Sequence, residues 1–259
     1  MTFNNKYLGE TRGSPEKYGL YKVESYLGKD KYLVRFYNGY TAEVVSQQIK
    51  YNSICNPYHP KIYGVGYKGC GEYSASERVC KGGARLYHAW SNMLERCYNS
   101  KYKEYHLYGG KGVYVCKNWH NFQAFAEWYQ KNVPERWHMD KDILVEGNLV
   151  YSESTCVGVP SELNGFITSS INRRGRNTYT GVYYVREGRW RVASYGTEGK
   201  QVTLGHTTTE LEGVRLYRKE KVRLANILAE KYKDVVDKRV YDYFINFTDH
   251  VDRLIVGEV

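Results

Sequence analysis

Acidic, basic and histidine side chains gather within a few positions near the middle of the chain. His138, Asp140 and Asp142 alternate along a segment that we expect to be extended, so their side chains would share one face. Lys141 stands between the two acids. One or two carboxylates with water can hold Mg²⁺, and a neutral histidine can accept a proton near pH 7. These residues predict a hydrolytic site with one divalent ion.

Turn residues and a helix start follow these side chains. Gly147 and Asn148 tolerate positive φ and predict a turn at 146–148. Pro160, with Glu shortly after it, predicts a helix that carries Asn164. A strand with an acid, a loop and a helix with an amide are together a way to hold one cation.

A plainer interpretation stays open for each of these residues. His138 also fits a surface histidine beside Trp137. Asp140, Asp142 and Asn164 also fit solvated loop residues that bind no metal.

The stretch 137–166 resembles the HNH (ββα-metal) endonuclease family, in the divergent form common in phage genomes. In that family a strand Asp binds the metal, an adjacent His activates water, a loop Asn steadies the His, and a helix residue is the second ligand. The resemblance implies that Asp140 and Asn164 bind the metal, with Asp142 as a third candidate ligand. It also puts Lys141 in the position of the general base and Thr155 in that of the loop Asn.

These departures leave the base and its support to other residues. We expect His138 to be a substitute base, with Lys141 the less favoured choice, and Asn148 and Thr155 to support the site. Upstream, the apolar spacing of 84–99 predicts a helix, and Phe122, Phe125, Ala126 and Tyr129 predict another. The order of motifs in this segment is similar to that of phage HNH-like proteins, which widens the resemblance to residues 84–166.

Composition favours a polyanionic partner. The 259 residues carry a net charge of +10, and 28 of them are Tyr. Cations meet phosphates while rings stack on bases, so double-stranded DNA is the expected partner; packing of Tyr in a small β core is the alternative. The chain has no run of 18 apolar residues and no apolar signal core, so we expect no membrane and an intracellular location. Its six Cys lack Cys-x-x-Cys spacing, so we expect no zinc.

The first sixty residues predict a small β domain. Segments 18–26, 31–37 and 40–45 read as strands, and Asn38-Gly39 predicts a hairpin turn between the last two. Residues 61–83 read as a Gly- and Tyr-rich connector that lies close to something, with the DNA backbone as one candidate.

The C-terminal part predicts three strands and a long helix. Strands are expected at 179–185, 189–195 and 200–205, and Thr209 with Glu212 forms a capping box at the helix start. This unit, 179–259, resembles the ethylene-response-factor (Apetala-type) DNA-binding domain, whose sheet lies in the major groove with the helix behind it. Strand parity places Trp190 and Val192 on the helix side. The basic linker 168–178 would lie along the DNA backbone or groove, the alternative being a solvated linker. The expected DNA-binding residues of linker and sheet are Arg173, Arg174, Arg176, Tyr183, Arg186, Arg189, Arg191, Tyr195, Gln201 and Thr203.

The sequence therefore predicts an α+β protein with a small N-terminal β barrel or sheet, a central HNH-like domain at 84–167 and the C-terminal DNA-binding unit. The leading hypothesis is a phage-type, homing-like endonuclease that uses Mg²⁺ or Mn²⁺ in the cytoplasm of an infected bacterium. A monomer with one centre would nick one strand. The alternatives are an inactive DNA-binding descendant of such nucleases and an inhibitor that binds a host protein.

Overall fold

The chain forms an α+β protein with two compact units. The computed structural model describes residues 6–145, 147–171, 179–196 and 199–247. One unit comprises Met1–Gln130 with Leu149–Ser152, and the other Lys131–Asn148 with Glu153–Val259. The predicted nuclease domain, 84–167, is thus divided between the two units. No described helix has the length and apolar character needed to cross a membrane.

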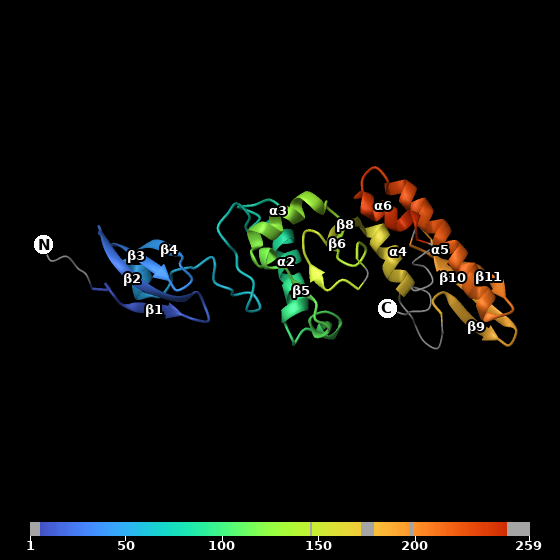
Figure 1. Cartoon of the computed structure of the whole chain (residues 1–259), viewed down its shortest axis with the longest axis horizontal. Helices are drawn as coiled ribbons and strands as arrows, with labels where there is room; N and C mark the ends of the chain where they lie inside the picture. The colour runs from blue at the N-terminus through green and yellow to red at the C-terminus, as the bar shows by residue number, and fades with distance from the viewer. Residues whose placement is uncertain (1–5, 146, 172–178, 197–198, 248–259) are drawn as a thin grey trace. The chain divides into compact units, whose positions relative to one another are not determined.

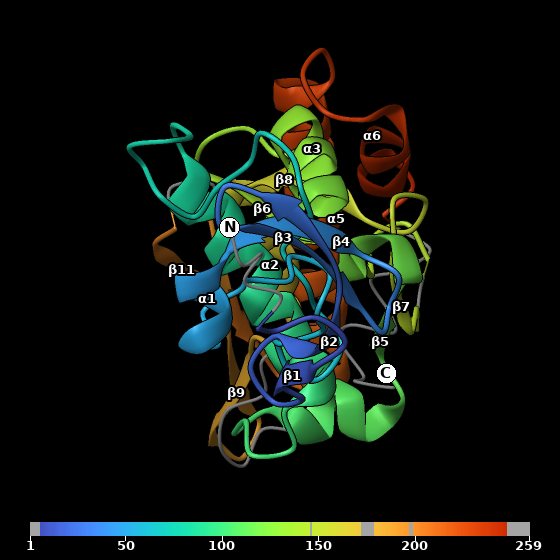
Figure 2. The same ribbon diagram turned by 90° about the vertical axis from the view of Figure 1, so that its left-hand side faces the viewer.

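The N-terminal sheet confirms the predicted strands and hairpin (Figures 1 and 2). It contains β1 (Thr11–Ser14), β2 (Gly19–Gly28), β3 (Lys31–Phe36) and β4 (Thr41–Val45), antiparallel in chain order, and α1 (Ser46–Lys50) follows. Along β3, alternate residues Tyr32, Val34 and Phe36 are buried, as expected for a strand with one face on the core. Gly39 has φ +90°, which the turn between β3 and β4 requires.

Two helices and a pair of short strands complete the first unit. Its further elements are α2 (Gly83–Tyr98), α3 (Phe122–Asn132), the 3₁₀ turns η1 (Tyr105–Leu107), η2 (Gly109–Lys111) and η3 (Lys117–His120), and the parallel strands β5 (Tyr114–Val115) and β7 (Val150–Tyr151). Both predicted helices are present, and the aromatic residues Trp90, Trp119, Phe122 and Phe125 are all buried. The Trp90 indole donates to the carbonyl of Trp119 at 2.7 Å, which joins α2 to η3.

The glycines of the connector are explained by the protein itself. A Cβ on Gly66 would lie 2.4 Å from the Leu94 side chain. A Cβ on Gly69 would lie 2.3 Å from Asn121, and one on Gly71 would lie 2.3 Å from Gln123. The connector therefore approaches α2 and the start of α3 closely, and this packing explains the three glycines without a DNA contact.

In the second unit a hairpin leads into a helix. Strands β6 (Trp137–Asp140) and β8 (Val157–Pro160) pair antiparallel, with Trp137 opposite Pro160 and Asp140 opposite Val157. The helix α4 (Ser161–Ile171) starts directly after β8. Only glycine fits at position 158, because a Cβ there would lie 2.1 Å from the carbonyl oxygen of Asn132.

The remaining elements confirm the predicted C-terminal sheet and helix. Strands β9 (Val182–Arg186), β10 (Arg189–Tyr195) and β11 (Gln201–Thr207) form an antiparallel sheet in the order β11-β10-β9, followed by α5 (Glu210–Tyr232) and α6 (Lys238–Ile245). The capping box is present: the Glu212 N–H donates to Thr209 Oγ1, and the Thr209 N–H donates to Glu212 Oε2.

One hydrophobic core joins the hairpin, α4 and the C-terminal elements. Val159 of β8 and Leu163 of α4 share this core with Val192 of β10, Leu228 of α5 and Phe244 of α6. The predicted nuclease and DNA-binding domains therefore do not have separate cores at this point. The β6–β8 hairpin and α4 share one core with the C-terminal sheet and its helices.

Candidate functional site

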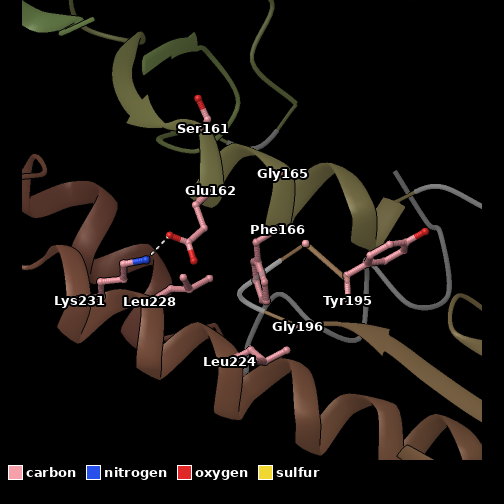
Figure 3. Close-up of a pocket in the computed structure, with 10 residues that line it drawn as sticks. Ser161, Glu162, Gly165, Phe166, Tyr195, Gly196, Leu224, Leu228 and Lys231 are labelled. Atoms are coloured by element: carbon pink, nitrogen blue, oxygen red, sulfur yellow. Dashed lines mark hydrogen bonds and ion pairs between the residues drawn. The ribbon is translucent and has the colours of Figure 1, made fainter. Parts of the chain in front are cut away.

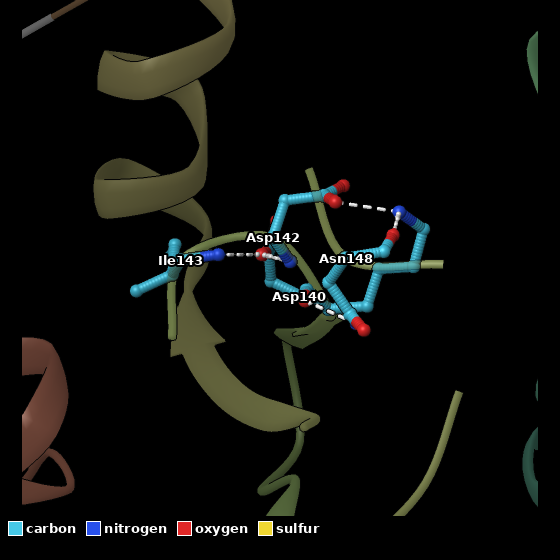
Figure 4. A network of polar contacts seen from close by, with 5 residues as sticks. Asp140, Asp142, Ile143 and Asn148 are labelled. Carbon is cyan, nitrogen blue, oxygen red and sulfur yellow. Dashed lines mark hydrogen bonds and ion pairs between the residues drawn. The ribbon is translucent and has the colours of Figure 1, made fainter. Parts of the chain in front are cut away.

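Asp140 organises the turn that leaves the first strand of the hairpin (Figure 4). It is the last residue of β6, and its Oδ1 accepts hydrogen bonds from the N–H groups of Asp142 at 2.7 Å and Ile143 at 2.8 Å. Burial raises the pKa of Asp140, and the two N–H donors only partly oppose this rise. No described residue donates a hydrogen bond to its other oxygen, Oδ2, so that oxygen can accept a ligand.

Lys141 and Asn148 bond to each other across the loop that follows. The buried Lys141 ammonium donates to the carbonyl oxygen of Asn148 at 2.7 Å and to Asp142 Oδ1 at 2.5 Å. In return, Asn148 Nδ2 donates to the carbonyl oxygen of Lys141 at 2.8 Å. Lys141, which the predicted resemblance put in the position of a general base, is thus held by a loop asparagine, Asn148.

The predicted acidic face is only partly correct. The strand ends at Asp140, so Asp142 does not continue the alternation of His138 and Asp140. Its carboxylate turns to the Lys141 ammonium instead, because burial of that cation requires a nearby anion. His138 is exposed on β6, opposite Val159.

The other predicted residues lie on the elements expected for them. Asn164 is in the first turn of α4, and Thr155 lies in the turn before β8. Among the described residues, no hydrogen bond joins Asp140 to His138 or Asn164. The described chain also contains no group of three or more His, Cys, Asp or Glu placed to hold a metal.

A second set of predicted residues meets on the face of the C-terminal sheet opposite α5. Val182 and Val192 are fully buried in the core that α5 shares, so their neighbours Tyr183 and Arg191 lie on the other face. The Arg191 guanidinium lies 4.8 Å from the centre of the Tyr183 ring, and Gln201 Nε2 donates to the Tyr183 hydroxyl at 3.2 Å. Tyr183, Arg191 and Gln201 therefore form one connected group, which we call the open-face cluster.

The open-face cluster spans all three strands of the sheet. Tyr183 is on β9 and Gln201 on β11, so their hydrogen bond crosses the central strand β10. Ala193 of β10 lies between them, and it is 1% exposed.

The remaining predicted DNA contacts are exposed, with one group outside the described residues. Arg186 pairs with Arg189 beside the β9–β10 turn, Tyr195 pairs with Gln201, and Thr203 pairs with Ala193. Arg173, Arg174 and Arg176 fall in 172–178, which the structure does not describe.

Sequence reasoning missed His206 because of a β-bulge. Counting by twos from Gln201 and Thr203 would place residue 205 on the open face. The register shifts between Val192 and Ala193, so that Gly205 pairs with Val192 and the exposed His206 pairs with Arg191. His206 thus joins the same face as Arg191. Gly205 is a sequence signal for this bulge, because a glycine inside a strand often marks one, and counting by twos overlooks it.

Comparison with known proteins gives no match, so any functional assignment rests on the geometry of the site. No protein-family model matches the chain, and the searches of curated proteins and of solved structures gave no match.

Proposed function

We propose that this protein binds double-stranded DNA through the open face of the β9–β11 sheet. The open-face cluster is the observation that carries the proposal. The Tyr183 ring orients the Arg191 guanidinium, and an oriented guanidinium can donate two hydrogen bonds to guanine in the major groove. The net charge of +10 adds attraction to phosphates at any sequence.

Exchange of Arg191 tests this proposal. Arg191→Ala should weaken duplex binding by about 1–3 kcal/mol, the usual value of one good bidentate contact. Arg215→Ala is the matched control, because Arg215 is exposed on α5, which packs on the opposite face of the sheet. Equal loss of affinity in both variants, or none in either, would contradict a specific role of the open face.

A second candidate function is metal-dependent strand cleavage. Its support is the order β6, loop, β8, α4, with Asp140 at the end of the first strand and Asn148 holding the residue beside it. The free Oδ2 of Asp140 and the position of Asn164 on α4 fit one Mg²⁺ or Mn²⁺ that keeps several waters, with Asp142 as a further ligand.

In such a cleavage reaction each residue of the site would have a separate role. A bound divalent ion would supply charge stabilisation at the scissile phosphate. Asp140 would hold it, and His138, exposed on β6, would accept a proton from water. Lys141 is less suited to act as the base, because its ammonium already bonds Asp142 and Asn148.

A plasmid assay separates the two candidate functions. Supercoiled plasmid with Mg²⁺ or Mn²⁺ should be converted to the nicked form by the wild-type protein and not by Asp140→Asn. Asparagine retains an Oδ1 that can accept from residues 142 and 143, so the turn should be preserved. Retention of plasmid without ion-dependent nicking would leave DNA binding as the function.

A further inference from the structure

We infer that a cavity in the second unit is a binding site for a nucleobase that carries an exocyclic amino group. The inference deepens the proposed DNA-binding function and rests on it for the source of the base. The cavity has a volume of about 560 Å³, within the range of about 300–1,000 Å³ typical of small-molecule sites. Its walls come from α4, α5 and the end of β10 (Figure 3).

The walls combine apolar surface with a single acid. Phe166 of α4 and Leu224 and Leu228 of α5 supply the apolar part. Glu162 points from α4 towards α5, where its Oε2 accepts from Lys231 at 2.5 Å and from the Tyr232 hydroxyl at 2.7 Å. A flat ring with polar edges suits such a site. The faces of the ring can contact the apolar walls, and its edge can hydrogen-bond to Glu162.

The second carboxylate oxygen of Glu162, Oε1, determines which nucleobase edges the cavity favours. This oxygen is buried, and no described residue donates a hydrogen bond to it. A buried acceptor without a donor is costly, so a ligand that brings an N–H group is favoured. Adenine, cytosine and guanine present an amino group, whereas the thymine N–H lies between two carbonyl oxygens that a carboxylate repels.

The aromatic wall is held in place before any ligand binds. The Lys221 ammonium lies 3.3 Å from the centre of the Phe166 ring and donates to the Phe166 carbonyl at 3.2 Å. Phe244 and Phe247 pack against the same ring, with centroid distances of 5.6 and 5.2 Å. A fixed ring lowers the entropic cost of binding.

The cavity also adjoins the proposed DNA surface. Tyr195 lines it, and Tyr195 is the β10 residue paired with Gln201 of the open-face cluster. The cavity itself lies on the α5 side of the sheet, so a base extruded from DNA would enter it around the end of β10, past Tyr195, and not through the open face. A free nucleoside carries the same chemistry, so the two sources must be separated by experiment.

The DNA arm of the test uses 2-aminopurine, an amino-bearing base whose fluorescence rises when it leaves the stack. It is placed opposite an abasic site, where extrusion costs least. Wild-type protein should raise the fluorescence, and Leu228→Trp, which fills the cavity, should not. Ile227→Trp is the control, because Ile227 is the exposed neighbour on α5.

The free-nucleoside arm uses calorimetry with adenosine, cytidine, guanosine and thymidine. The first three should bind better than thymidine, and Glu162→Gln should reduce that preference by about tenfold, the value of one hydrogen bond to a charged group. This variant leaves the cavity open, so it also serves if Leu228→Trp fails to fold.

The outcomes separate this inference from the proposed function. A fluorescence rise that Leu228→Trp abolishes supports an extruded base, and nucleoside binding without that rise supports a free nucleoside. Duplex binding that depends on Arg191, with no rise and no nucleoside binding, overturns the nucleobase site and leaves the DNA-binding function intact. No duplex binding at all overturns the DNA-binding function, and the nucleoside arm then decides the cavity alone.

Discussion

At the scale of single residues, Asp140 uses one carboxylate oxygen to close a turn, and the proposed cleavage function would use the other to bind a metal ion. Its Oδ1 closes the turn after β6, and burial raises its pKa. A carboxyl whose pKa is raised in the folded state stabilises the fold below its unfolded pKa, and this contribution is lost as the pH rises through the folded pKa.

The variant Asp140→Asn tests this account of the carboxyl. Asparagine keeps the two turn hydrogen bonds and cannot ionise, so the variant should gain stability relative to wild type as the pH rises from about 4. Urea unfolding from pH 4 to 8 measures the difference. A constant difference across this range would mean that the pKa of Asp140 is not raised in the folded protein.

Asn148 is the residue that holds the loop beside the candidate site. Its side chain donates to the Lys141 carbonyl in a buried setting, so Asn148→Ala should reduce the free energy of unfolding by about 1–3 kcal/mol. Leu149→Ala is a control at the exposed neighbour. Urea unfolding should show the larger loss for position 148, and equal losses would contradict the assigned role.

At the scale of elements, Lys221 joins α4 and α5 through a buried amine. Its side chain bonds the Phe166 carbonyl, and burial lowers its pKa to about 7. The unfolded chain therefore holds this proton up to a higher pH than the folded chain does. Stability should rise with pH between about 7 and 10, where only the unfolded state binds the proton.

The variant Lys221→Met removes the titrating group and keeps a similar length. Its stability should lack the rise between about pH 7 and 10 that wild type shows, since no amine remains to be discharged. Lys219→Met, at an exposed position of the same helix, should keep the rise. Denaturant unfolding at pH 7 and 9.5 measures both, and parallel curves for all three proteins would refute the burial of this amine.

Local signals predicted the elements well, and packing decided what they could not predict. The Asn38-Gly39 turn and the Thr209–Glu212 capping box act within a few residues, so the sequence displays them. The burial of Lys141 depends on the loop that returns at Asn148, and the shared core of α4 and α5 depends on contacts far apart in the chain. Neither the burial of Lys141 nor the shared core of α4 and α5 produces a periodic pattern in the sequence.

At the scale of the whole molecule, the excess of positive charge favours binding to a polyanion such as the proposed DNA partner. The chain carries 38 Lys and Arg against 28 Asp and Glu. Exposed Arg186, Arg189 and Lys200 belong to the C-terminal sheet or its turns. Several such cations can meet phosphates at once, each releasing counterions on binding.

DNA binding should therefore weaken steeply with salt. Each phosphate contact adds about −0.9 to the slope of log affinity against log salt concentration, so Lys200→Ala should lower the magnitude of the slope by about one for a phosphate contact. Binding measured between about 50 and 200 mM salt gives both slopes. Affinity for a host protein that persists in high salt, with no measurable DNA affinity at low salt, would instead favour the inhibitor, because a predominantly apolar interface does not depend on counterion release.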